Sequence, residues 1–166
     1  QGDLYIRGGG FDQTLLLVDG MKMDDAQTGH HTLNMILPLY LIERIEIIKG
    51  PAARIFGQNA FNGAINIVTK EFEGEKRTVN LNLNELSYGS FEQKNISLST
   101  KIIGEKIKSL ISYSGNRSDG YRHNTDFKKN NYFIKTSFNS NNSPVDVIAS
   151  FTENKFGANG FYASPS

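Results

Sequence analysis

The most constraining feature of this sequence is the segment 43–70, where two alternating stretches flank a short run bounded by glycines. At its start, charged residues alternate with Ile45 and Ile47, the period of two that is typical of a half-buried strand. The Gly-Pro pair at 50–51 stops that strand and favours a helical turn, because proline fits the first helical position. Residues 64–69 alternate again. The segment therefore predicts a strand, a helical turn and a second strand.

Three further segments overlap or precede this one. Residues 6–10 read Ile-Arg-Gly-Gly-Gly, residues 14–20 form an apolar run that ends in Asp-Gly, and residues 36–44 contain Ile-Leu-Pro followed by Ile-Glu-Arg. In this order and near this spacing, the segments resemble the plug domain of TonB-dependent outer-membrane transporters. The resemblance covers about the first 70 residues at the level of motifs and the rest of the chain only by pattern.

The resemblance implies an α+β plug domain followed by the antiparallel strands of a transmembrane β-barrel. Residues 1–70 would be the C-terminal part of the plug, and residues 71–166 the first five barrel strands. Barrels that hold a plug have about 22 strands, and an open sheet edge in lipid would leave backbone groups unpaired. We therefore expect this chain to be a fragment of a larger protein, without the start of the plug, the TonB box and most of the barrel wall.

The composition is compatible with such a barrel. Hydrophobic residues make up 38% of the 166 positions and the mean hydropathy is −0.40, values that are usual for a soluble protein. Barrel strands also keep the average low, because apolar residues that face lipid alternate with polar residues that face the lumen. The net charge is +1 and the sequence contains no long basic block, so nucleic-acid binding is not indicated. Cysteine is absent, which excludes disulfides, thiolate zinc sites and cysteine nucleophiles.

Five alternating segments follow residue 77, and each predicts a strand with one apolar and one polar face. In the clearest, residues 79–84, a valine and two leucines alternate with three asparagines, whose amides would be costly in hydrocarbon. The other four lie near residues 93–103, 106–114, 132–139 and 145–152. Leu110 and Ile148 interrupt this alternation, because they fall on its polar side.

The connections between these segments alternate in length. Residues 104–105 form a tight turn and residues 140–144 a short one, whereas residues 115–129 and the chain after Asn154 are long and polar. Outer-membrane barrels have short periplasmic turns and long extracellular loops. We therefore expect the long connections to lie outside the cell, and only the connection at 86–91 is shorter than expected for that side.

Alternation alone is also what a soluble antiparallel sheet with one buried face shows. A soluble β-rich binding or adhesion domain is therefore the alternative of another class, and a requirement for detergent would separate the two. An enzyme is not indicated. Residues 8–10 lack the spacing of a dinucleotide or phosphate-binding loop, and no motif with a nucleophile, a metal or paired carboxylates stands out.

The resemblance places candidate ligand contacts in two plug loops. In family members of the cobalamin type, the loop after the Asp-Gly turn, here residues 23–32, faces the external cavity and touches the ligand. Its candidate contacts are Thr28, Gly29, His30 and His31, and those of a second loop beside it are Gly10 and Phe11. A solvated loop without ligand is the alternative. Metal binding by the histidine pair is disfavoured, because neighbours in an extended segment point to opposite sides.

The predicted external loops add further candidates for ligand contact. Residues 116–127 and 156–162 mix aromatic, amide and charged side chains with glycine, which offers contact area and directional hydrogen bonds. The candidates are Tyr121, Arg122, Asn124, Phe161 and Tyr162. These loops resemble those of the cobalamin-receptor branch of the family. Asp119 and Asp126 are calcium candidates, but two carboxylates are too few for an oxygen cage, and no metal site is predicted.

A set of charges in the plug region is a candidate contact with the barrel wall. Its members are Arg7, Glu43, Arg44 and Glu46, with Lys49 and Arg54 beside them. The resemblance implies that the arginine of the first motif and the charges of the Ile-Glu-Arg motif help to hold the plug in the lumen. The alternative is that they are ordinary exposed strand charges, which contribute little each.

The resemblance implies active transport of a scarce, bulky nutrient across the bacterial outer membrane. Cobalamin or a related corrinoid is the first candidate, and a ferric siderophore or haem is the second. The implied partners are TonB with its inner-membrane complex, the nutrient and outer-membrane lipid, and a surface lipoprotein that covers the external face is left open. No cofactor and no nucleic acid are implied.

Overall fold

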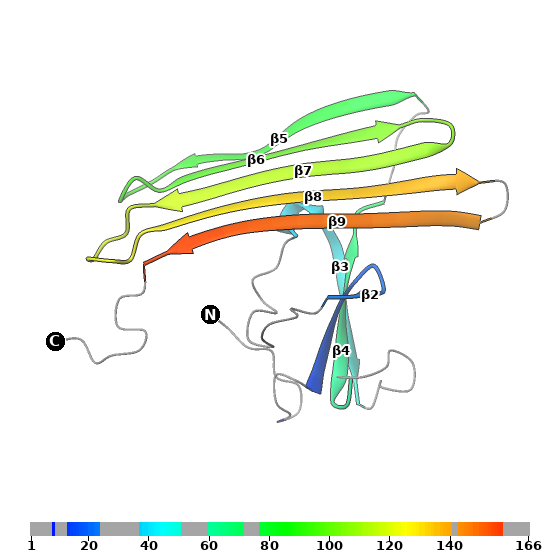
Figure 1. Ribbon diagram of the computed structural model, residues 1–166, viewed down its shortest axis with the longest axis horizontal. Helices are drawn as coiled ribbons and strands as arrows, with labels where there is room; N and C mark the ends of the chain where they lie inside the picture. Colours follow the sequence, from blue (N-terminus) through cyan, green and yellow to red (C-terminus); the bar gives the residue numbers. More distant parts are fainter. Residues whose placement is uncertain are drawn as a thin grey trace. The chain divides into compact units, whose positions relative to one another are not determined.

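The computed structural model describes residues 8, 13–23, 37–50, 60–71, 77–140 and 143–157. The chain separates into two compact units, residues 1–71 and 72–166, and each contains one β-sheet (Figure 1). Among the described residues, no helix is long and apolar enough to cross a membrane.

The first unit contains a mixed four-stranded sheet. Its strands are β1 (Thr14–Val18), β2 (Met21–Lys22), β3 (Ile42–Lys49) and β4 (Gly63–Thr69), and they lie in the order β2-β1-β4-β3. β1 and β4 run parallel, and the other two pairs are antiparallel. A single turn of 3₁₀ helix, η3 (Leu39–Leu41), leads into β3. The two strands predicted in the segment 43–70 are therefore present, and the helical turn predicted between them lies outside the described residues.

The core of this unit forms around β1, an inner strand whose five residues are all buried. Leu15 and Leu17 pack with Ala60 and Ala64, and Ile48 adds to this cluster. A continuous apolar run suits such a strand, because both of its faces are covered. The apolar run in the sequence of β1 therefore agrees with the burial of all its residues, although this run does not alternate with polar residues.

The edge strand β3 corrects one expectation. Alternation predicted a strand half-buried through Ile45 and Ile47, but these side chains are 55% and 56% exposed. The strand itself is confirmed. Its position at the sheet edge explains the difference, since only β4 lies beside it, and alternation predicts which face a side chain occupies rather than whether anything covers that face.

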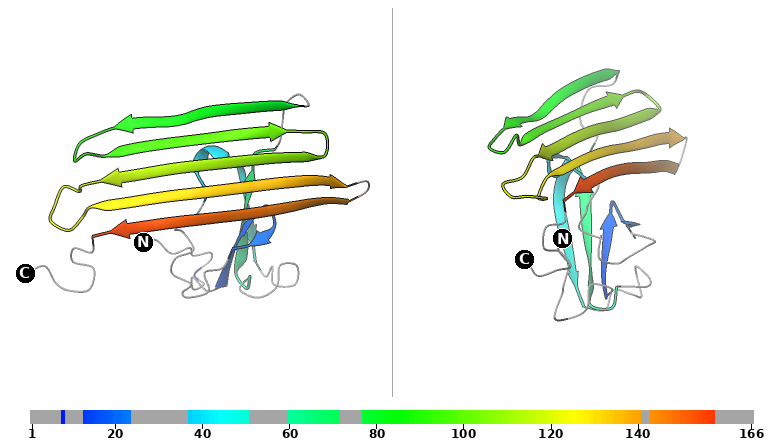
Figure 2. Two further views of the ribbon diagram at one scale, coloured as in Figure 1. Left: turned by 45° about the horizontal axis from the view of Figure 1, so that its top comes forward. Right: turned by 60° about the vertical axis from the view of Figure 1, so that its left-hand side comes forward.

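The second unit is an antiparallel meander of five strands, as predicted. They are β5 (Thr78–Tyr88), β6 (Lys94–Ile103), β7 (Ile107–Ser118), β8 (Phe127–Ser140) and β9 (Ser143–Phe156), each paired with the next. Figure 2 shows them as one continuous, twisted sheet. The tight turn predicted at residues 104–105 is confirmed between β6 and β7.

The strands are longer than the sequence patterns predicted. Residues 115–118 extend β7, residues 127–129 begin β8, and β9 continues to Phe156. The connection predicted over 115–129 therefore shrinks to residues 119–126. These strand ends are polar, so their composition resembles that of a loop, but backbone pairing continues through them to Ser118 opposite Phe127.

A β-bulge in β5 keeps its apolar side chains on one face. The pairing register shifts between Leu83 and Glu85, so that Leu83 lies opposite Leu98 and Leu86 lies opposite Ile96. Without the extra residue, Leu86 would project from the opposite face to Leu83. The bulge therefore extends the apolar face to the end of the strand.

Burial in the second sheet is reversed relative to an ordinary soluble sheet. Apolar side chains on one face are 36% to 78% exposed: Val79, Leu81, Leu83, Leu86, Ile96, Ile102, Ile107, Ile111, Tyr132, Ile134, Phe138, Val145, Val147 and Phe151. On the other face, the small polar residues Ser97, Ser99, Ser112, Ser114 and Asn131 are buried. Leu110 projects from that polar face, as predicted from its place in the pattern, and is buried there beside buried Phe133.

Candidate functional site

Two connections at the same end of the second sheet form its candidate site (Figure 1). Residues 89–93 join β5 to β6, and residues 119–126 join β7 to β8. Continuous backbone pairing carries the strands as far as Tyr88 and Ser118. Because both connections leave a hydrogen-bonded sheet, their side chains start from fixed positions, which is the usual basis of a binding loop.

Phe91 fastens the two connections to each other. Its carbonyl accepts a hydrogen bond from the backbone N–H of Asp119 at 2.9 Å and one from the hydroxyl of Ser118 at 3.1 Å. Phe91 and Glu92 both have positive φ values, 58° and 54°, which are uncommon for residues with a side chain. Such strained backbone persists where its surroundings hold it, and it concentrates at functional sites.

An aromatic and cationic surface is built on this junction. The rings of Phe91 and Tyr121 meet edge to face, with their centroids 6.2 Å apart. The guanidinium of Arg122 lies 4.9 Å from the centroid of the Tyr121 ring. Phe91 and Tyr121 remain 56% and 63% exposed. The surface can therefore stack against a flat ring system and attract an anionic group.

Thr125 and Gly157 hold the loop that carries these side chains. The Thr125 hydroxyl accepts a hydrogen bond from the N–H of Arg122 at 3.1 Å and donates one to its carbonyl at 2.8 Å. Gly157 follows β9, and its N–H donates to the carbonyl of Asp126 at 2.8 Å. A Cβ at Gly157 would collide with the backbone of Asn124, so this close approach requires glycine. The predicted contacts Tyr121, Arg122 and Asn124 thus lie in one loop that is tied to the end of β9.

The two calcium candidates are not part of a larger acidic group. The carboxylate of Asp119 lies 3.6 Å from the guanidinium of Arg117. Within the described part of the chain, no group of three or more histidine, cysteine, aspartate and glutamate side chains could hold a metal ion. Asp119 and Asp126 therefore gain no further acidic ligand from the residues that the structure describes.

In the first unit, the Asp-Gly turn after β1 is anchored to β4. Asp19 and Gly20 have φ values of 48° and 78°, as a two-residue type I′ hairpin requires. The Asp19 carboxylate accepts hydrogen bonds from the Thr69 N–H at 2.8 Å and from the Thr69 hydroxyl at 2.6 Å. Since Thr69 is fully buried, this carboxylate fixes the turn against the last residue of β4.

A chain of polar side chains continues from this turn across β4 and β3. The N–H of Gly20 donates to the Asn66 amide oxygen at 3.0 Å, and the Asn66 amide N–H donates to Glu46 at 2.9 Å. Arg44 donates from Nε to Glu46 at 2.9 Å and from Nη1 to Glu43 at 3.0 Å. A bulge at Glu43 allows adjacent residues to meet in this way, since the register of β3 shifts there.

These contacts change the acidity of the two central groups. Hydrogen bonds from Asn66 and Arg44 lower the pKa of Glu46 below its ordinary value, because they favour the ionised carboxylate. The hydrogen bond with Glu46 raises the pKa of Arg44 further. Glu43, Arg44 and Glu46 are thus brought together and paired within their own sheet, and their contact with a barrel wall stays a prediction.

The remaining predicted site residues lie outside the described part of the chain. They are Arg7, Gly10, Phe11, Thr28, Gly29, His30, His31, Phe161 and Tyr162. Sequence reasoning in turn missed Phe91, Thr69 and Asn66. An aromatic residue inside a short polar turn is a signal that could have drawn attention to Phe91, whereas the partners of the Asp-Gly turn depend on strand pairing over long sequence separations.

Comparisons with known proteins agree with this architecture. A model of the TonB-dependent Receptor Plug Domain matches residues 1–64. A protein from Vibrio vulnificus named Vitamin B12 transporter BtuB is 33% identical over 123 residues, which are 73% of this chain and 19% of that protein. A protein from Vibrio cholerae named Iron-regulated outer membrane virulence protein is 40% identical over 75 residues, which are 42% of this chain and 12% of that protein.

A solved structure extends the comparison beyond the plug. The siderophore receptor PirA from Pseudomonas aeruginosa superposes with a TM-score of 0.66 at 26% identity, over 93% of this chain and 28% of that one. The chain thus spans 12% to 28% of the length of these relatives. The resemblance inferred from the sequence motifs is confirmed. The chain carries the plug domain of the TonB-dependent receptors in residues 1–64, and those receptors are proteins of the bacterial outer membrane.

Proposed function

We propose that this chain is the plug-to-barrel region of a TonB-dependent transporter that carries a corrinoid, cobalamin first among them, across the outer membrane. In this proposal residues 1–70 are the C-terminal part of the plug, and residues 71–166 are the first five strands of a barrel of about 22. The long connections face outward, and the turn at residues 104–106 faces the periplasm.

The reversed burial of the second sheet carries the proposal. One face of the meander exposes apolar side chains on all five strands, while Ser97, Ser99, Ser112, Ser114 and Asn131 of β6, β7 and β8 are buried on the other face. Strands of outer-membrane barrels place apolar residues toward lipid and polar residues toward the lumen. The polar ladder from Ser114 through Asn131 to Thr152, with hydrogen bonds of 3.2 Å and 3.0 Å, supports the assignment of the second face to the lumen.

The aromatic and cationic surface at Phe91, Tyr121 and Arg122 is the proposed external contact with the nutrient. A corrinoid presents a large, partly flat ring system, which exposed aromatic rings can contact over a wide area. The plug loops with Thr28 to His31 and with Gly10 and Phe11 are further proposed contacts with the nutrient.

Transport would then follow from coupling between two sites. Nutrient bound on the external side would change the plug so that its TonB box becomes available in the periplasm. Binding of the nutrient and exposure of the TonB box would then be linked by a coupling free energy. TonB, driven by its inner-membrane complex, would pull on the plug and open a path. A surface lipoprotein over the external loops is a partner that this mechanism permits but does not need.

A ferric siderophore or haem is the second candidate substrate. The observation in its favour is the similarity over 93% of the chain to a structure named as a siderophore receptor. The corrinoid ranks first because the protein named as a vitamin B12 transporter is more similar, at 33% identity.

The test is an equilibrium titration of cyanocobalamin against the full-length protein in detergent. We expect binding that Tyr121→Ala and Arg122→Ala each weaken about tenfold, or roughly 1.4 kcal/mol. Glu105→Ala, in the turn at the other end of the sheet, is the control and should leave the affinity unchanged. Replacement of residues 28–31 by Gly-Ser tests the plug loop in the same assay. Absence of binding by the unaltered protein would remove cobalamin, and ferric siderophores would be titrated next.

The soluble alternative predicts a different behaviour of the same protein. If the exposed apolar face packed against a second protein layer, the full-length protein would stay monodisperse in buffer without detergent. We expect it instead to aggregate when detergent is removed and to remain dispersed in lipid. A stable, monomeric protein in plain buffer would overturn the membrane assignment.

A further inference from the structure

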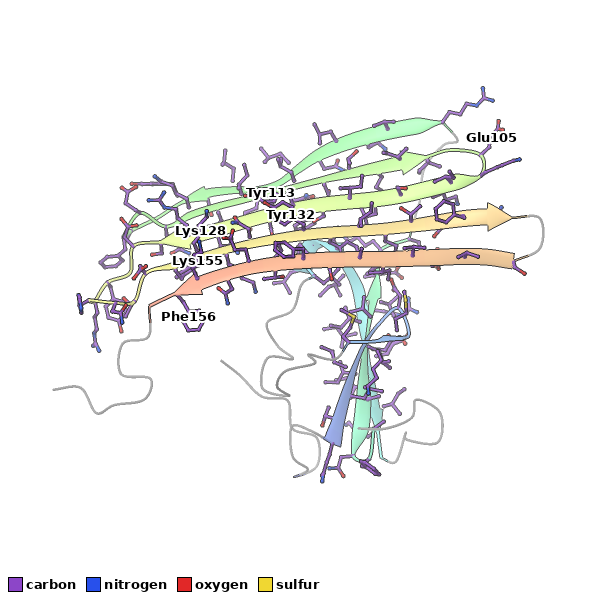
Figure 3. The ribbon with its side chains drawn as sticks, in the orientation of Figure 1. Glu105, Tyr113, Lys128, Tyr132, Lys155 and Phe156 are labelled. Atoms are coloured by element: carbon purple, nitrogen blue, oxygen red, sulfur yellow. The ribbon has the colours of Figure 1, made fainter. Side chains whose placement is uncertain are left out.

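Four cations stand in one row across the second sheet. The strand register places Lys94 opposite Arg117, Arg117 opposite Lys128, and Lys128 opposite Lys155. All four side chains project from the face that carries the exposed apolar residues, because each lies an even number of positions from an apolar residue of its own strand. We call these four residues the cationic row. Figure 3 shows Lys128 and Lys155 together at the end of the sheet opposite Glu105.

Such a row is unfavourable unless anions accompany it, since like charges directly opposite each other destabilise a pair of strands. Three members have a carboxylate nearby: Lys94 has Glu92 at 2.8 Å, Arg117 has Asp119 at 3.6 Å, and Lys155 has Glu153 at 3.3 Å. Lys128 forms no ion pair with any residue that the structure describes. Four cations thus face three carboxylates, of which Glu153 also interacts electrostatically with Lys128, and the row retains one net positive charge.

The cationic row borders the apolar band of the sheet. Two positions further along the strands lie Gly115, Asn130 and Glu153, and two positions beyond those lie Tyr113, Tyr132 and Phe151, which we call the aromatic row. Its ring centroids are 5.2 Å and 6.2 Å apart. Only apolar and hydroxyl side chains continue beyond it as far as Ile107, Phe138 and Val145 on these three strands.

This sequence of rows matches the profile of a membrane boundary. Barrels carry aromatic girdles where hydrocarbon meets headgroups, and long basic side chains reach from that level into the headgroup layer. Tyr113 also donates its hydroxyl hydrogen bond to Asn130 at 3.3 Å, so the polar tip of the ring points away from the apolar band. The cationic row therefore lies where lipid phosphates would be.

A hollow in the apolar band lies beside the aromatic row. It measures about 400 Å³ and spans all five strands between larger side chains on its margins. Thr100, Ile111, Ile134 and Ala149 lie in one row and line the hollow. Leu81, Leu98, Tyr132 and Phe151 line its rim. An acyl chain would fill such a space, and the phosphate of the same lipid would then stand at the cationic row.

We propose that the cationic row is a binding site for an outer-leaflet lipid whose phosphate headgroup carries a net negative charge, with an acyl chain of that lipid in the hollow below. The site rests on the proposed membrane function, which places the end of the sheet with the connection 119–126 outside the cell. The other end of the same face offers no comparable row among the described residues, because its one arginine, Arg77, is paired with Glu105 at 2.7 Å. The proposed site would therefore bind lipid phosphates of the outer leaflet and not those of the inner leaflet.

The experiment compares lipid binding by the full-length, detergent-purified protein and two matched variants. Native mass spectrometry would count dioleoyl phosphatidic acid and dioleoyl phosphatidylcholine bound at equal concentrations. R117Q/K128Q removes two charges from the cationic row, whereas K106Q/K108Q removes two charges near the opposite end, one in the turn and one on the polar face. We expect the unaltered protein and K106Q/K108Q to prefer phosphatidic acid about tenfold or more.

R117Q/K128Q should lose most of this preference, and added salt should reduce it in the unaltered protein, because the row is exposed and screening is effective there. Equal binding of both lipids by the unaltered protein, or an undiminished preference in R117Q/K128Q, would overturn the proposal. So would competition by inorganic phosphate at the same concentration as the lipid, because the site would then recognise the free anion. Cyanocobalamin titration of the same samples distinguishes failure of the lipid proposal from failure of the transport proposal. Neither variant alters Tyr121 or Arg122, so both should still bind cyanocobalamin if the transport proposal holds.

Discussion

The two sheets of this chain place apolar side chains in opposite environments. In the first, the apolar residues of β1 are 1% to 4% exposed, and Leu15 and Leu17 pack in a cluster formed within the unit. In the second, apolar side chains of one face are 36% to 78% exposed, and small polar residues of β6, β7 and β8 are buried on the other face. The difference shows that β-strands with similar sequences can suit different surroundings. Leu15 and Leu17 of the first sheet are covered within their own unit, whereas the exposed face of the second sheet would be covered by the proposed outer-membrane lipid.

Leu17→Ala should have the largest effect, because it removes side-chain volume from the closed core of the first sheet. Leu17 is 2% exposed and packs in the cluster with Leu15, Ala60 and Ala64. Loss of a buried leucine costs about 2–5 kcal/mol. Hydrogen exchange of the β1 and β4 amides in the full-length protein would report this as faster local opening. Leu81→Ala, on the exposed face of β5, is the control and should leave exchange in the first sheet unchanged.

A charge on the apolar face of β5 tests the other half of the comparison. Leu81 and Asn82 are neighbours that project from opposite faces, and both are exposed. In lipid, Leu81→Arg should destabilise the barrel by about 2–4 kcal/mol if it lies near the midplane, while Asn82→Arg in the polar lumen should cost much less. Reversible unfolding of the full-length protein in lipid vesicles measures both. Equal costs for the two substitutions would show that the faces are not distinguished by lipid.

Sequence patterns predicted most of the strands but less of what surrounds them. Alternation identified all five strands of the second sheet because its period depends only on neighbouring residues. It missed the ends of β7 and β8, where residues such as Asn116 and Lys129 are polar in both strand and loop. It also misjudged Ile45 and Ile47, because exposure at an edge strand depends on what packs against the sheet.

The candidate site divides in the same way. Tyr121, Arg122 and Asn124 could be named from loop composition, and the structure brings them together in one held loop. The ring of Phe91 stands out in its short polar turn, but its role could not be derived from composition. That role depends on hydrogen bonds that the Phe91 carbonyl accepts from Ser118, 27 residues away, and from Asp119. Local sequence predicts which side chains a loop offers, whereas contacts between loops follow from the strand register.

Asp19→Asn should have an intermediate effect in the first sheet. The Asp19 carboxylate accepts two hydrogen bonds from buried Thr69, and the loss of a charged acceptor to a buried donor costs about 1–3 kcal/mol. Asparagine keeps one acceptor oxygen and tolerates the positive φ of this turn, so Asp19→Ala should be the more harmful change. Hydrogen exchange at the Thr69 amide would rank the two. No loss of protection in either variant would mean that the carboxylate does not hold the turn.

Glu46 should give the smallest effect, one that is visible as a dependence on pH. The Asn66 amide and Arg44 lower its pKa in the folded protein, whereas an unfolded chain has a glutamate pKa of about 4.3. The unfolded state therefore binds the proton first, so the stabilisation is fully present above that pH and is lost as the pH falls through the lower folded value. Hydrogen exchange of the β3 and β4 amides between pH 3 and pH 6 should show this loss in the unaltered protein and not in Glu46→Gln. Glu105→Gln, whose carboxylate lies in the second unit, should retain the full dependence on pH in β3. If Glu46→Gln kept it as well, the ionised carboxylate would have no part in joining β3 to Asn66, and the polar chain from Gly20 to Arg44 would depend on neutral hydrogen bonds alone.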